Sequence, residues 1–332
     1  MSVRMKEEDI RKYETFVQYL ELVQKDAETI FGDRSSFQDL PCPACGESNA
    51  SLVFEKIGFR YVQCPRCDTL YVNPRPALPH LLKIYEDSPS TRYWVEEFFR
   101  PMIEPRRERI FRPRAEYISS RFPELRGKII ADIGAGFGLF LEELQNVWPG
   151  TKLTAIEPSI DMAKICEENG FTVIQSMLED IDPQQHSFDL LTAFELFEHL
   201  HSPGAFVKKV FDLLSPGGYF FLTTLNGLGF DIQVLWEKSQ SVSPPHHLNF
   251  FNPRSISALF ESHGFEVIEA STPGQLDWDI LESAVKKGGT APGRFFETLM
   301  KYADDKAKED LQVWIRDHGF SSHMRLIARK KE

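Results

Sequence analysis

Long apolar runs are missing from this sequence of 332 residues. None approaches the roughly 18 to 20 consecutive apolar residues that a membrane-spanning helix needs. The first 25 residues are rich in Glu and Lys and lack the apolar centre of a secretory signal peptide. These absences predict a cytoplasmic protein with no membrane partner. Only five cysteines are present, and disulfides are rare in a reducing compartment, which argues against a disulfide-bonded fold.

An excess of basic charge is missing as well. The net charge is −11 and the isoelectric point is near 5.4, whereas nucleic-acid-binding proteins usually present a basic face. This balance argues against a nucleic acid as the main partner, although a local patch can oppose the total. The length allows one large core with a small satellite domain.

The spacing of apolar residues divides the chain into four predicted parts. These are an N-terminal amphipathic helix in residues 1–40, a cysteine-bearing module in 41–76, a helical connector in 77–125 and a large domain in 126–332 with a helical insertion at 276–318. In the large domain, apolar strand-like runs alternate with helices, which predicts an α/β fold with helices on both faces of a parallel sheet. The first helix, over residues 5–31, either packs on the body or pairs with a partner chain. It therefore permits an oligomer without requiring one.

Four of the five cysteines form two C-x-x-C pairs separated by 18 residues, namely Cys42, Cys45, Cys64 and Cys67. Each pair can point two thiolates at one ion, and together they complete a tetrahedral site. Four thiolates leave no open coordination position, so this zinc ribbon is predicted to hold a structural zinc ion. Two unrelated surface pairs are the alternative. The remaining cysteine, Cys166, is interpreted as a small core residue.

A glycine-rich segment, with the sequence Asp132-Ile-Gly134-Ala-Gly136-Phe-Gly138, follows the first strand of the large domain. Glycines at a strand end let the backbone turn sharply and approach a ligand closely. The third glycine comes one position too early for the dinucleotide pattern G-x-G-x-x-G, which disfavours a nicotinamide dehydrogenase. The next strand ends at Glu157, which can accept hydrogen bonds from ribose hydroxyls. The alternative role of Glu157 is a carboxylate at a helix start.

Residues 127–225 resemble the class I S-adenosylmethionine-dependent methyltransferases in four consecutive motifs. The motifs are DIGAGFG (132–138), AIEPS (155–159), FDLLTAFELFEHL (188–200) and LLSPGGYFFLTT (213–224). The resemblance implies a Rossmann-like, seven-stranded methyltransferase sheet and S-adenosyl-L-methionine as cofactor. The implied cofactor residues are Asp132, Gly134, Ala135 and Gly136 near the methionine part, Glu157 at the ribose, Met177 and Leu178 beside the adenine, and Phe194 and Glu195 at the end of the fourth strand.

Two histidine-bearing segments are candidates for the acceptor chemistry. Glu195, Glu198 and His199 form E-x-x-E-H, and a similar motif in quinone-pathway O-methyltransferases is associated with a divalent cation. The resemblance thus offers a cation as the alternative to a structural role for His199 near the pocket. His246 and His247 follow the fifth strand, on the side where open α/β sheets bind ligands. Because imidazole can accept a proton near neutral pH, His247, His246 and His199 are the predicted catalytic residues, with packing as the alternative.

The ribbon and the large domain together are similar to bacterial methyltransferases with an N-terminal zinc ribbon. These include sugar C-methyltransferases and polysaccharide-cluster methyltransferases. The sugar enzymes carry a Tyr-x-Glu-His loop motif whose histidine falls on His247, the implied base, while Pro244 and His246 replace the tyrosine and the glutamate. The resemblance implies a small-molecule acceptor, a sugar or nucleotide-linked sugar, methylated on carbon or oxygen. The alternatives are an RNA methyltransferase whose ribbon grips RNA and a non-catalytic cofactor-binding scaffold.

Further candidates lie outside these motifs. Asp277 and His323 in the closing segments could line the acceptor pocket, and Tyr93 and Trp94 could cover the cofactor. A segment with a local net charge of +4 precedes the glycine loop. It sets six arginines against two glutamates: Arg100, Arg106, Arg107, Arg109, Arg112 and Arg114 against Glu104 and Glu108. Such arginines suit a diphosphate, and a solvated helix face is the alternative.

Overall fold

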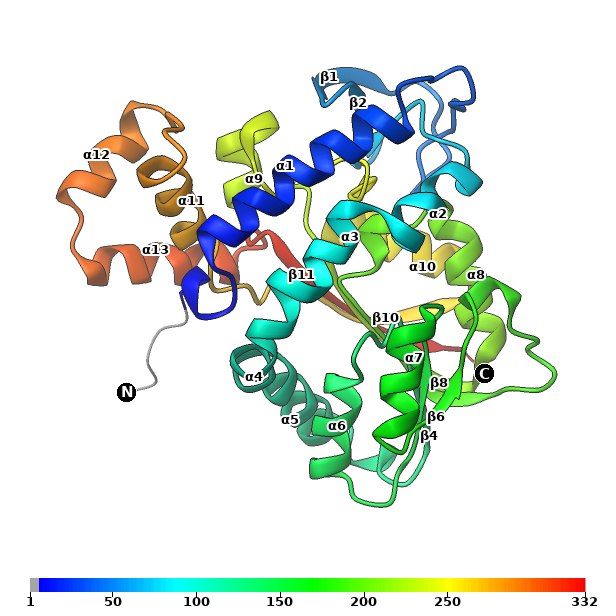
Figure 1. Ribbon diagram of the computed structural model, residues 1–332. Helices are drawn as coiled ribbons and strands as arrows, with labels where there is room; N and C mark the ends of the chain where they lie inside the picture. The colour runs from blue at the N-terminus through cyan, green and yellow to red at the C-terminus, as the bar shows by residue number, and fades with distance from the viewer. Residues whose placement is uncertain (1–5, 332) are drawn as a thin grey trace.

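A seven-stranded mixed sheet forms the centre of the computed structural model, which describes residues 6–331 (Figure 1). In chain order the strands are β4 (Ile129–Ile133), β5 (Lys152–Ile156), β6 (Thr172–Ile174), β7 (Phe188–Phe194), β8 (Leu214–Leu225), β10 (Phe265–Ser271) and β11 (His323–Lys330). In space their order is β10-β11-β8-β7-β4-β5-β6, and β11 runs antiparallel to both of its neighbours. The strand order reverses beside β4, so the carboxyl ends of β4, β5 and β7 form the expected ligand side. The predicted seven-stranded α/β fold is confirmed.

Helices cover both faces of this sheet. One face carries α5 (Arg112–Arg121), α6 (Leu139–Val147) and α7 (Ile160–Glu168), and the other carries α8 (Pro203–Leu213) and α10 (Pro253–Ser262). Successive side chains of a strand point to opposite faces. Leu190 and Leu191 of β7 accordingly belong to opposite apolar clusters. Burial on both faces explains why the central strands read as continuous apolar runs.

The cysteine-bearing module forms a small antiparallel sheet that includes part of the large domain. Its own strands are β1 (Ser51–Lys56), β2 (Phe59–Gln63) and β3 (Leu70–Val72), and the fourth strand is β9 (Asn249–Phe250) from the loop after β8. β9 pairs with β3 so that Leu70 faces Phe250 and Tyr71 faces Asn249. A two-residue strand leaves no alternation in the sequence, so this pairing was not predicted. The boundary predicted at residue 76 therefore separates chain segments that share one sheet.

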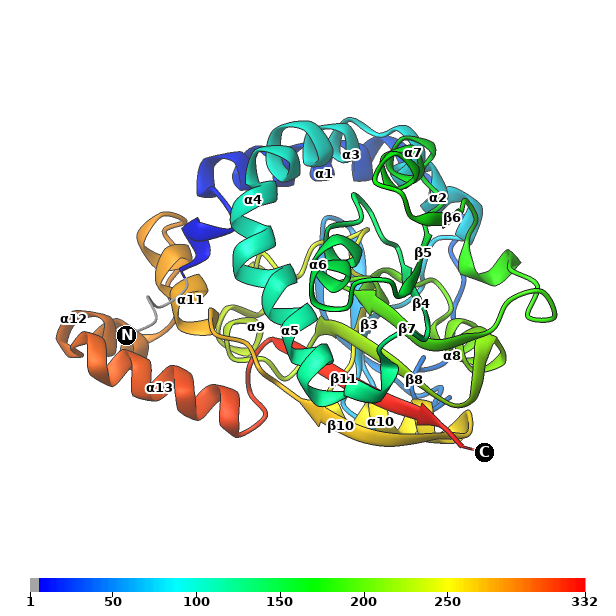
Figure 2. The ribbon, with the colours of Figure 1, turned by 90° about the horizontal axis from the view of Figure 1, so that it is seen from below.

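The N-terminal helices arch over the carboxyl edge of the large sheet (Figure 2). They are η1 (Glu7–Asp9), α1 (Tyr13–Ile30), α2 (Leu78–Asp87), α3 (Pro89–Tyr93), η2 (Trp94–Phe99), η3 (Arg100–Met102), α4 (Ile103–Arg106) and η4 (Arg107–Phe111). The helix predicted over residues 5–31 is interrupted, because Lys12 is extended and α1 begins only at Tyr13. α1 packs along α3 and η2 of the same chain. Both η2 and η4 are π-helical turns.

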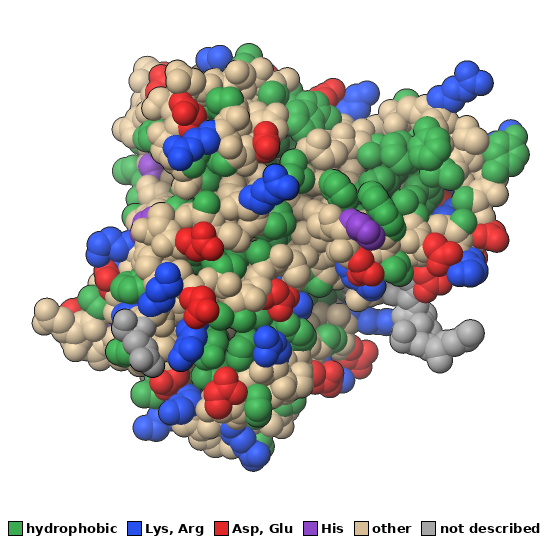
Figure 3. All heavy atoms as spheres, turned by 180° about the vertical axis from the view of Figure 1, so that it is seen from behind, with side chains coloured by type: hydrophobic (Ala, Val, Ile, Leu, Met, Phe, Trp, Pro, Cys, Tyr) green, Lys and Arg blue, Asp and Glu red, His purple; other side chains and the backbone are tan. Residues whose placement is uncertain are grey.

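Three helices project from the body between β10 and β11 (Figure 1). They are α11 (Asp277–Lys286), α12 (Arg294–Tyr302) and α13 (Asp305–Asp317), and with α9 (Phe230–Leu235) they enclose a small core around Trp278. Figure 3 shows hydrophobic side chains gathered over this projection, where Phe295 and Tyr302 are 67% and 74% exposed. Short 3-10 turns complete the fold: η5 (Pro123–Leu125), η6 (Leu178–Asp180), η7 (Phe197–His199) and η8 (Trp236–Lys238). Within residues 6–331, no helix combines the length and apolar character needed to cross a bilayer.

Candidate active site

The glycine loop turns at the carboxyl end of β4. Gly134, Gly136 and Gly138 all have positive φ angles, of 69°, 55° and 75°, which residues with a Cβ rarely adopt. The amide of Gly134 donates a hydrogen bond to the carbonyl of Ile156 at 2.8 Å, so the loop is tied to the end of β5. A Cβ at Gly138 would lie 3.2 Å from the sulfur of buried Cys166. The loop thus lies close to both β5 and α7.

Two buried carboxylates flank this loop. Asp132 accepts a hydrogen bond from the hydroxyl of Thr192 at 2.6 Å, and burial raises the pKa of Asp132 to about 7. Glu157 accepts hydrogen bonds from the amides of Gly136 at 2.8 Å and Ser159 at 2.9 Å. Burial raises the pKa of Glu157 above its ordinary value. Glu157 therefore bridges the loop after β4 and the start of α7, and its predicted role at the ribose stays a prediction.

The two residues predicted beside the adenine differ in exposure. Met177 is 37% exposed immediately before η6, whereas Leu178 is buried in the same apolar cluster as Ile181. The side chain of Met177 can contact a ligand. Leu178 can reach one only through its backbone, because its side chain packs in the core.

Glu198, His199 and His247 converge at the same edge of the sheet. One side-chain ligand atom from each lies within 4.8 Å of the others. Nδ1 of His199 donates to the carbonyl of His246 at 3.0 Å, and Nδ1 of His247 donates to the carbonyl of Ser241 at 2.6 Å. A carbonyl oxygen can only accept, so each Nδ1 carries the proton. Each Nε2 therefore presents a lone pair.

Burial sets the protonation of this cluster. It lowers the pKa of His199 and of His247 to about 4, so both imidazoles are neutral at pH 7. Burial, and then the nearby charge of Glu195, raise the pKa of Glu198 to about 7. The hydroxyl of Thr224 donates to the Glu198 carboxylate at 2.7 Å. Neutral imidazoles beside a carboxylate can accept a proton or bind a cation.

The third predicted catalytic histidine, His246, lies outside this cluster. Its ring is 5% exposed and packs between Tyr19 and Tyr85, with ring centroids 6.2 Å and 5.4 Å away. Burial holds the pKa of His246 far below its ordinary value, and its Nε2 has no hydrogen-bond partner. The backbone of His246 serves the site through its carbonyl, which orients His199. A catalytic role for the His246 ring stays a prediction.

The ribbon holds the loop that carries His247. The hydroxyl of Tyr61 donates to the His247 carbonyl at 2.9 Å. Arg75, which is 1% exposed, donates to the side-chain oxygen of Asn249 at 3.0 Å and to the carbonyl of His201 at 2.6 Å. The ribbon thereby joins the segments that follow β7 and β8. Sequence reasoning missed Tyr61 and Arg75, and the only visible signal was an arginine set between two prolines.

The four ribbon cysteines bring their sulfurs together. The sulfurs of Cys42 and Cys67 are 3.5 Å apart, those of Cys45 and Cys64 are 3.6 Å apart, and all four lie within 4.8 Å of one another. These separations exceed the roughly 2.05 Å of a disulfide. They are close to the separation of about 3.8 Å between thiolates that surround one ion at about 2.3 Å. The donor set therefore fits a closed, four-thiolate metal site.

A second polar group lies where β7 and β8 end. Glu195 accepts hydrogen bonds from Arg114 at 2.9 Å and Thr223 at 2.6 Å, and it lies 3.4 Å from Nδ1 of His323. Burial alone would raise the pKa of Glu195, but His323 and Arg114 bring it down to about 2. The side chains of Glu195 and His323 are 37% and 33% exposed, so both can contact a ligand at this edge of the sheet. The guanidinium of Arg114 also lies 4.6 Å from the ring of Phe194.

The side chain of Asp277 is buried, which does not support the pocket role predicted for it. Its carboxylate is 2% exposed and accepts hydrogen bonds from the Ser321 hydroxyl at 2.7 Å, the Ser322 amide at 2.6 Å and the Gln312 amide at 2.8 Å. These bonds join α11, α13 and the segment before β11. Because its oxygens are satisfied within the protein, Asp277 has a structural role.

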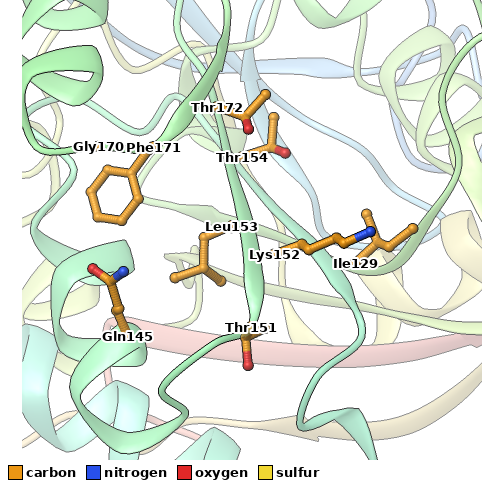
Figure 4. A pocket seen from close by; sticks show the side chains of 9 residues that line it. All are labelled: Ile129, Gln145, Thr151, Lys152, Leu153, Thr154, Gly170, Phe171 and Thr172. Carbon is orange, nitrogen blue, oxygen red and sulfur yellow. The ribbon is translucent and has the colours of Figure 1, made fainter.

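A separate pocket lies along β5 (Figure 4). Its lining residues are Ile129, Gln145, Thr151, Lys152, Leu153, Thr154, Gly170, Phe171 and Thr172. None of them belongs to the glycine loop, the histidine cluster or the ribbon. The candidate active site is instead the enclosed group of polar residues at the carboxyl edge of the sheet.

Comparison with known proteins locates the site within a family. A family of methyltransferase domains matches residues 102–270. The ubiquinone biosynthesis O-methyltransferases of Xanthomonas euvesicatoria pv. vesicatoria and Xanthomonas axonopodis pv. citri are 31% and 30% identical over 171 residues, covering 48% of this chain and 70% of each relative. A plantazolicin methyltransferase solved with S-adenosylhomocysteine aligns at 15% identity and a TM-score of 0.47, covering 76% of this chain and 94% of that one. The family match contains the glycine loop and the histidine cluster, and the ribbon precedes it.

Proposed function

Because this chain belongs to the family of methyltransferase domains and is an S-adenosylmethionine-dependent methyltransferase, we propose that it methylates a small-molecule acceptor, a sugar or nucleotide-linked sugar. His247 is the proposed base. The observation that carries this proposal is the position of the His247 ring, which lies beside Glu198 at the carboxyl edge of the sheet and has its Nδ1 bonded to the Ser241 carbonyl. Oxygen is the favoured acceptor atom, because the curated relatives are named as O-methyltransferases.

Different residues are proposed to bind the cofactor and to accept the proton of the acceptor. S-adenosylmethionine supplies a methyl group that is already activated, so the protein mainly aligns the acceptor and removes its proton. The glycine loop and Glu157 would hold the cofactor. The Ser241 carbonyl keeps the proton of His247 on Nδ1, so Nε2 is free to take a proton from the acceptor. The Glu198 carboxylate then stabilises the imidazolium that forms.

A divalent cation held by Glu198, His199 and His247 is the second candidate for this site. Both histidines donate their Nδ1 protons to backbone carbonyls, and metal-binding histidines usually anchor their second nitrogen in this way. Such a cation would supply Lewis acidity toward an acceptor hydroxyl. Separately, we propose that the four ribbon cysteines hold a structural zinc ion, because their sulfurs are spaced for tetrahedral ligation.

The ribbon offers little surface for gripping RNA. Four basic residues lie within it or at its end, and two of them bond inside the protein. Lys56 donates to the carbonyl of Ser239 at 2.8 Å, and Arg75 is buried. Arg60 and Arg66 remain exposed. Phosphate contacts supply most of the affinity of a nucleic-acid binder, so this ribbon favours an internal structural role over RNA binding.

The acceptor class can be tested with methyl-labelled S-adenosylmethionine. We expect label to enter a nucleotide-sugar fraction and not RNA or protein fractions incubated in parallel. A second arm adds EDTA while the zinc content is monitored. Activity that persists with zinc retained supports His247 as a base, whereas activity lost and restored by Mg²⁺ supports the cation. Label in RNA would overturn the small-molecule proposal, and cofactor binding without any transfer would favour a scaffold.

Glu157→Gln is expected to weaken S-adenosylhomocysteine binding by about 10- to 100-fold, because a hydrogen bond to a charged group contributes roughly 1.5–3 kcal/mol. Isothermal titration calorimetry measures this effect. Glu168→Gln, an exposed carboxylate on α7, is the matched control and should bind normally. Equal affinities for the two variants would leave Glu157 only its role at the start of α7.

A further inference from the structure

The structure separates the six arginines that precede the glycine loop. Arg100 pairs with Glu96, and Arg114 pairs with Glu195. Arg107 and Arg112 both pair with Glu143. Arg109 is exposed. Among residues 6–331, Arg106 has no carboxylate within ion-pair distance, and it is not exposed. It is therefore the member of this group that is partly buried and has no ion pair among the described residues.

Arg106 is a partly buried cation with few hydrogen-bond partners among the described residues. Its Nε atom is sealed from solvent and has no hydrogen-bond acceptor. Within residues 6–331 it makes one hydrogen bond, from a terminal nitrogen to the carbonyl of Ile10 at 3.5 Å, and its guanidinium lies 4.7 Å from the ring of Phe99. Burial and the charges of Arg114 and Arg11 lower the pKa of Arg106 to about 10, so it stays charged at pH 7. A buried charge without a counterion destabilises a protein.

Arg106 lies near two other arginines. The positive charges of Arg114 and Arg11 both disfavour the charged form of its guanidinium. Arg11 pairs with Glu7 and Arg114 pairs with Glu195. Among the described residues Arg106 has no ion pair of its own, and the carboxylate charge that favours its charged form is that of Glu195, which already pairs with Arg114.

A π-helical turn directs Arg106 into the interior. Arg106 and Arg114 are eight residues apart, which would place them about 80° apart around a regular α-helix. The turn η4 between them inserts an extra residue, which brings the two side chains back to one face. The same turn aligns Arg107 with Arg112, so both reach Glu143 of α6. Arg106 consequently shares the face of Arg114, which pairs with Glu195.

We propose that Arg106 binds an anionic group of the methyl acceptor, either a carboxylate or a phosphate. This inference rests on the proposed function, because it takes the acceptor to bind beside Glu195 at the carboxyl edge of the sheet. Arg114 stands nearer to Asp132, at the cofactor end, whereas Arg106 lies about two helical turns earlier, beside Ile10 of the N-terminal segment. A planar guanidinium can bind carboxylate or phosphate through two hydrogen bonds, and the Phe99 ring fixes its plane.

The test titrates inorganic pyrophosphate and malonate, as phosphate and carboxylate probes, into the full-length protein loaded with S-adenosylhomocysteine. We expect the wild-type protein to bind at least one probe, Arg106→Met to bind it at least tenfold more weakly, and Arg106→Lys to fall between them. Arg109→Met, an exposed arginine of the same segment, is the control and should match the wild type. Because Arg106→Met removes an unbalanced charge, we also expect it to raise the Tm of the ligand-free protein.

Two outcomes would overturn this inference. One is that the wild type, Arg106→Met and Arg106→Lys bind the probes with equal affinity, or that the wild type binds neither probe. The other is weakened S-adenosylhomocysteine binding with unchanged probe affinity, which would assign Arg106 to the carboxylate of the cofactor. Neither readout requires turnover. A failure to find a small-molecule acceptor would therefore be distinguishable from a failure of the anion site.

Discussion

Cys64→Ser is expected to reduce methyl transfer at least a hundredfold while S-adenosylhomocysteine still binds within a few-fold of the wild type. Structural zinc contributes on the order of 10 kcal/mol to the folding of such small modules, so losing one thiolate should unfold the ribbon. The ribbon supplies the hydrogen bond from Tyr61 to the His247 carbonyl and the pairing of β3 with β9. The glycine loop and Glu157 make no such contacts with it. Metal analysis, calorimetry and a transfer assay measure the three quantities.

Ser48→Ala is a matched control for this variant, because Ser48 is an exposed residue of the same ribbon. It should keep its zinc and its activity. If Cys64→Ser lost its zinc and still transferred methyl groups normally, the ribbon would not position His247. If it lost cofactor binding as well, the ribbon would be needed for the stability of the whole large domain.

His247→Ala is expected to lower kcat by about 10²- to 10⁴-fold, the usual range for a general base, with an unchanged affinity for S-adenosylhomocysteine. His318→Ala, an exposed histidine on the projecting helices, is the control and should be fully active. A loss of less than threefold in His247→Ala would eliminate this residue as the base.

The pH dependence of the same reaction separates His247 from its neighbour. Burial lowers the pKa of His247 to about 4, so its imidazole is already neutral from pH 6 upward and gives no step there. Burial raises the pKa of Glu198 to about 7, so its carboxyl is protonated below that pH and ionised above it. Because the ionised form stabilises the imidazolium, kcat should rise with pH through about 7. This step should disappear in Glu198→Gln.

The large sheet could be predicted because its strands are marked by patterns of neighbouring residues in the sequence. Buried central strands read as apolar runs between helices, and β7 occupies the residues predicted for it, Phe188 to Phe194. The glycine loop and the paired cysteines were visible for the same reason, since each motif is contained in a few adjacent residues. The structure adds that the three loop glycines have positive φ angles and that the four sulfurs meet.

The contacts that join distant segments could not be predicted. Arg75 bonds to Asn249, which is 174 residues away, and no local pattern marks such a pair. The π-helical turn η4 likewise leaves no periodic signal, yet it decides which arginines face inward. For Leu178 the position in the motif was recognised, but the direction of its side chain could not be predicted because it depends on packing in the core. The ligand positions of a site are thus easier to predict than the supports that orient them.

The arch of N-terminal helices over the carboxyl edge has a consequence for the order of events in one turnover. The glycine loop and Glu157 lie against the sheet, whereas Arg106 belongs to the connector within the arch (Figure 2). An acceptor held between them would cover the cofactor. This favours a compulsory sequence in which S-adenosylmethionine enters first and the methylated product leaves before S-adenosylhomocysteine.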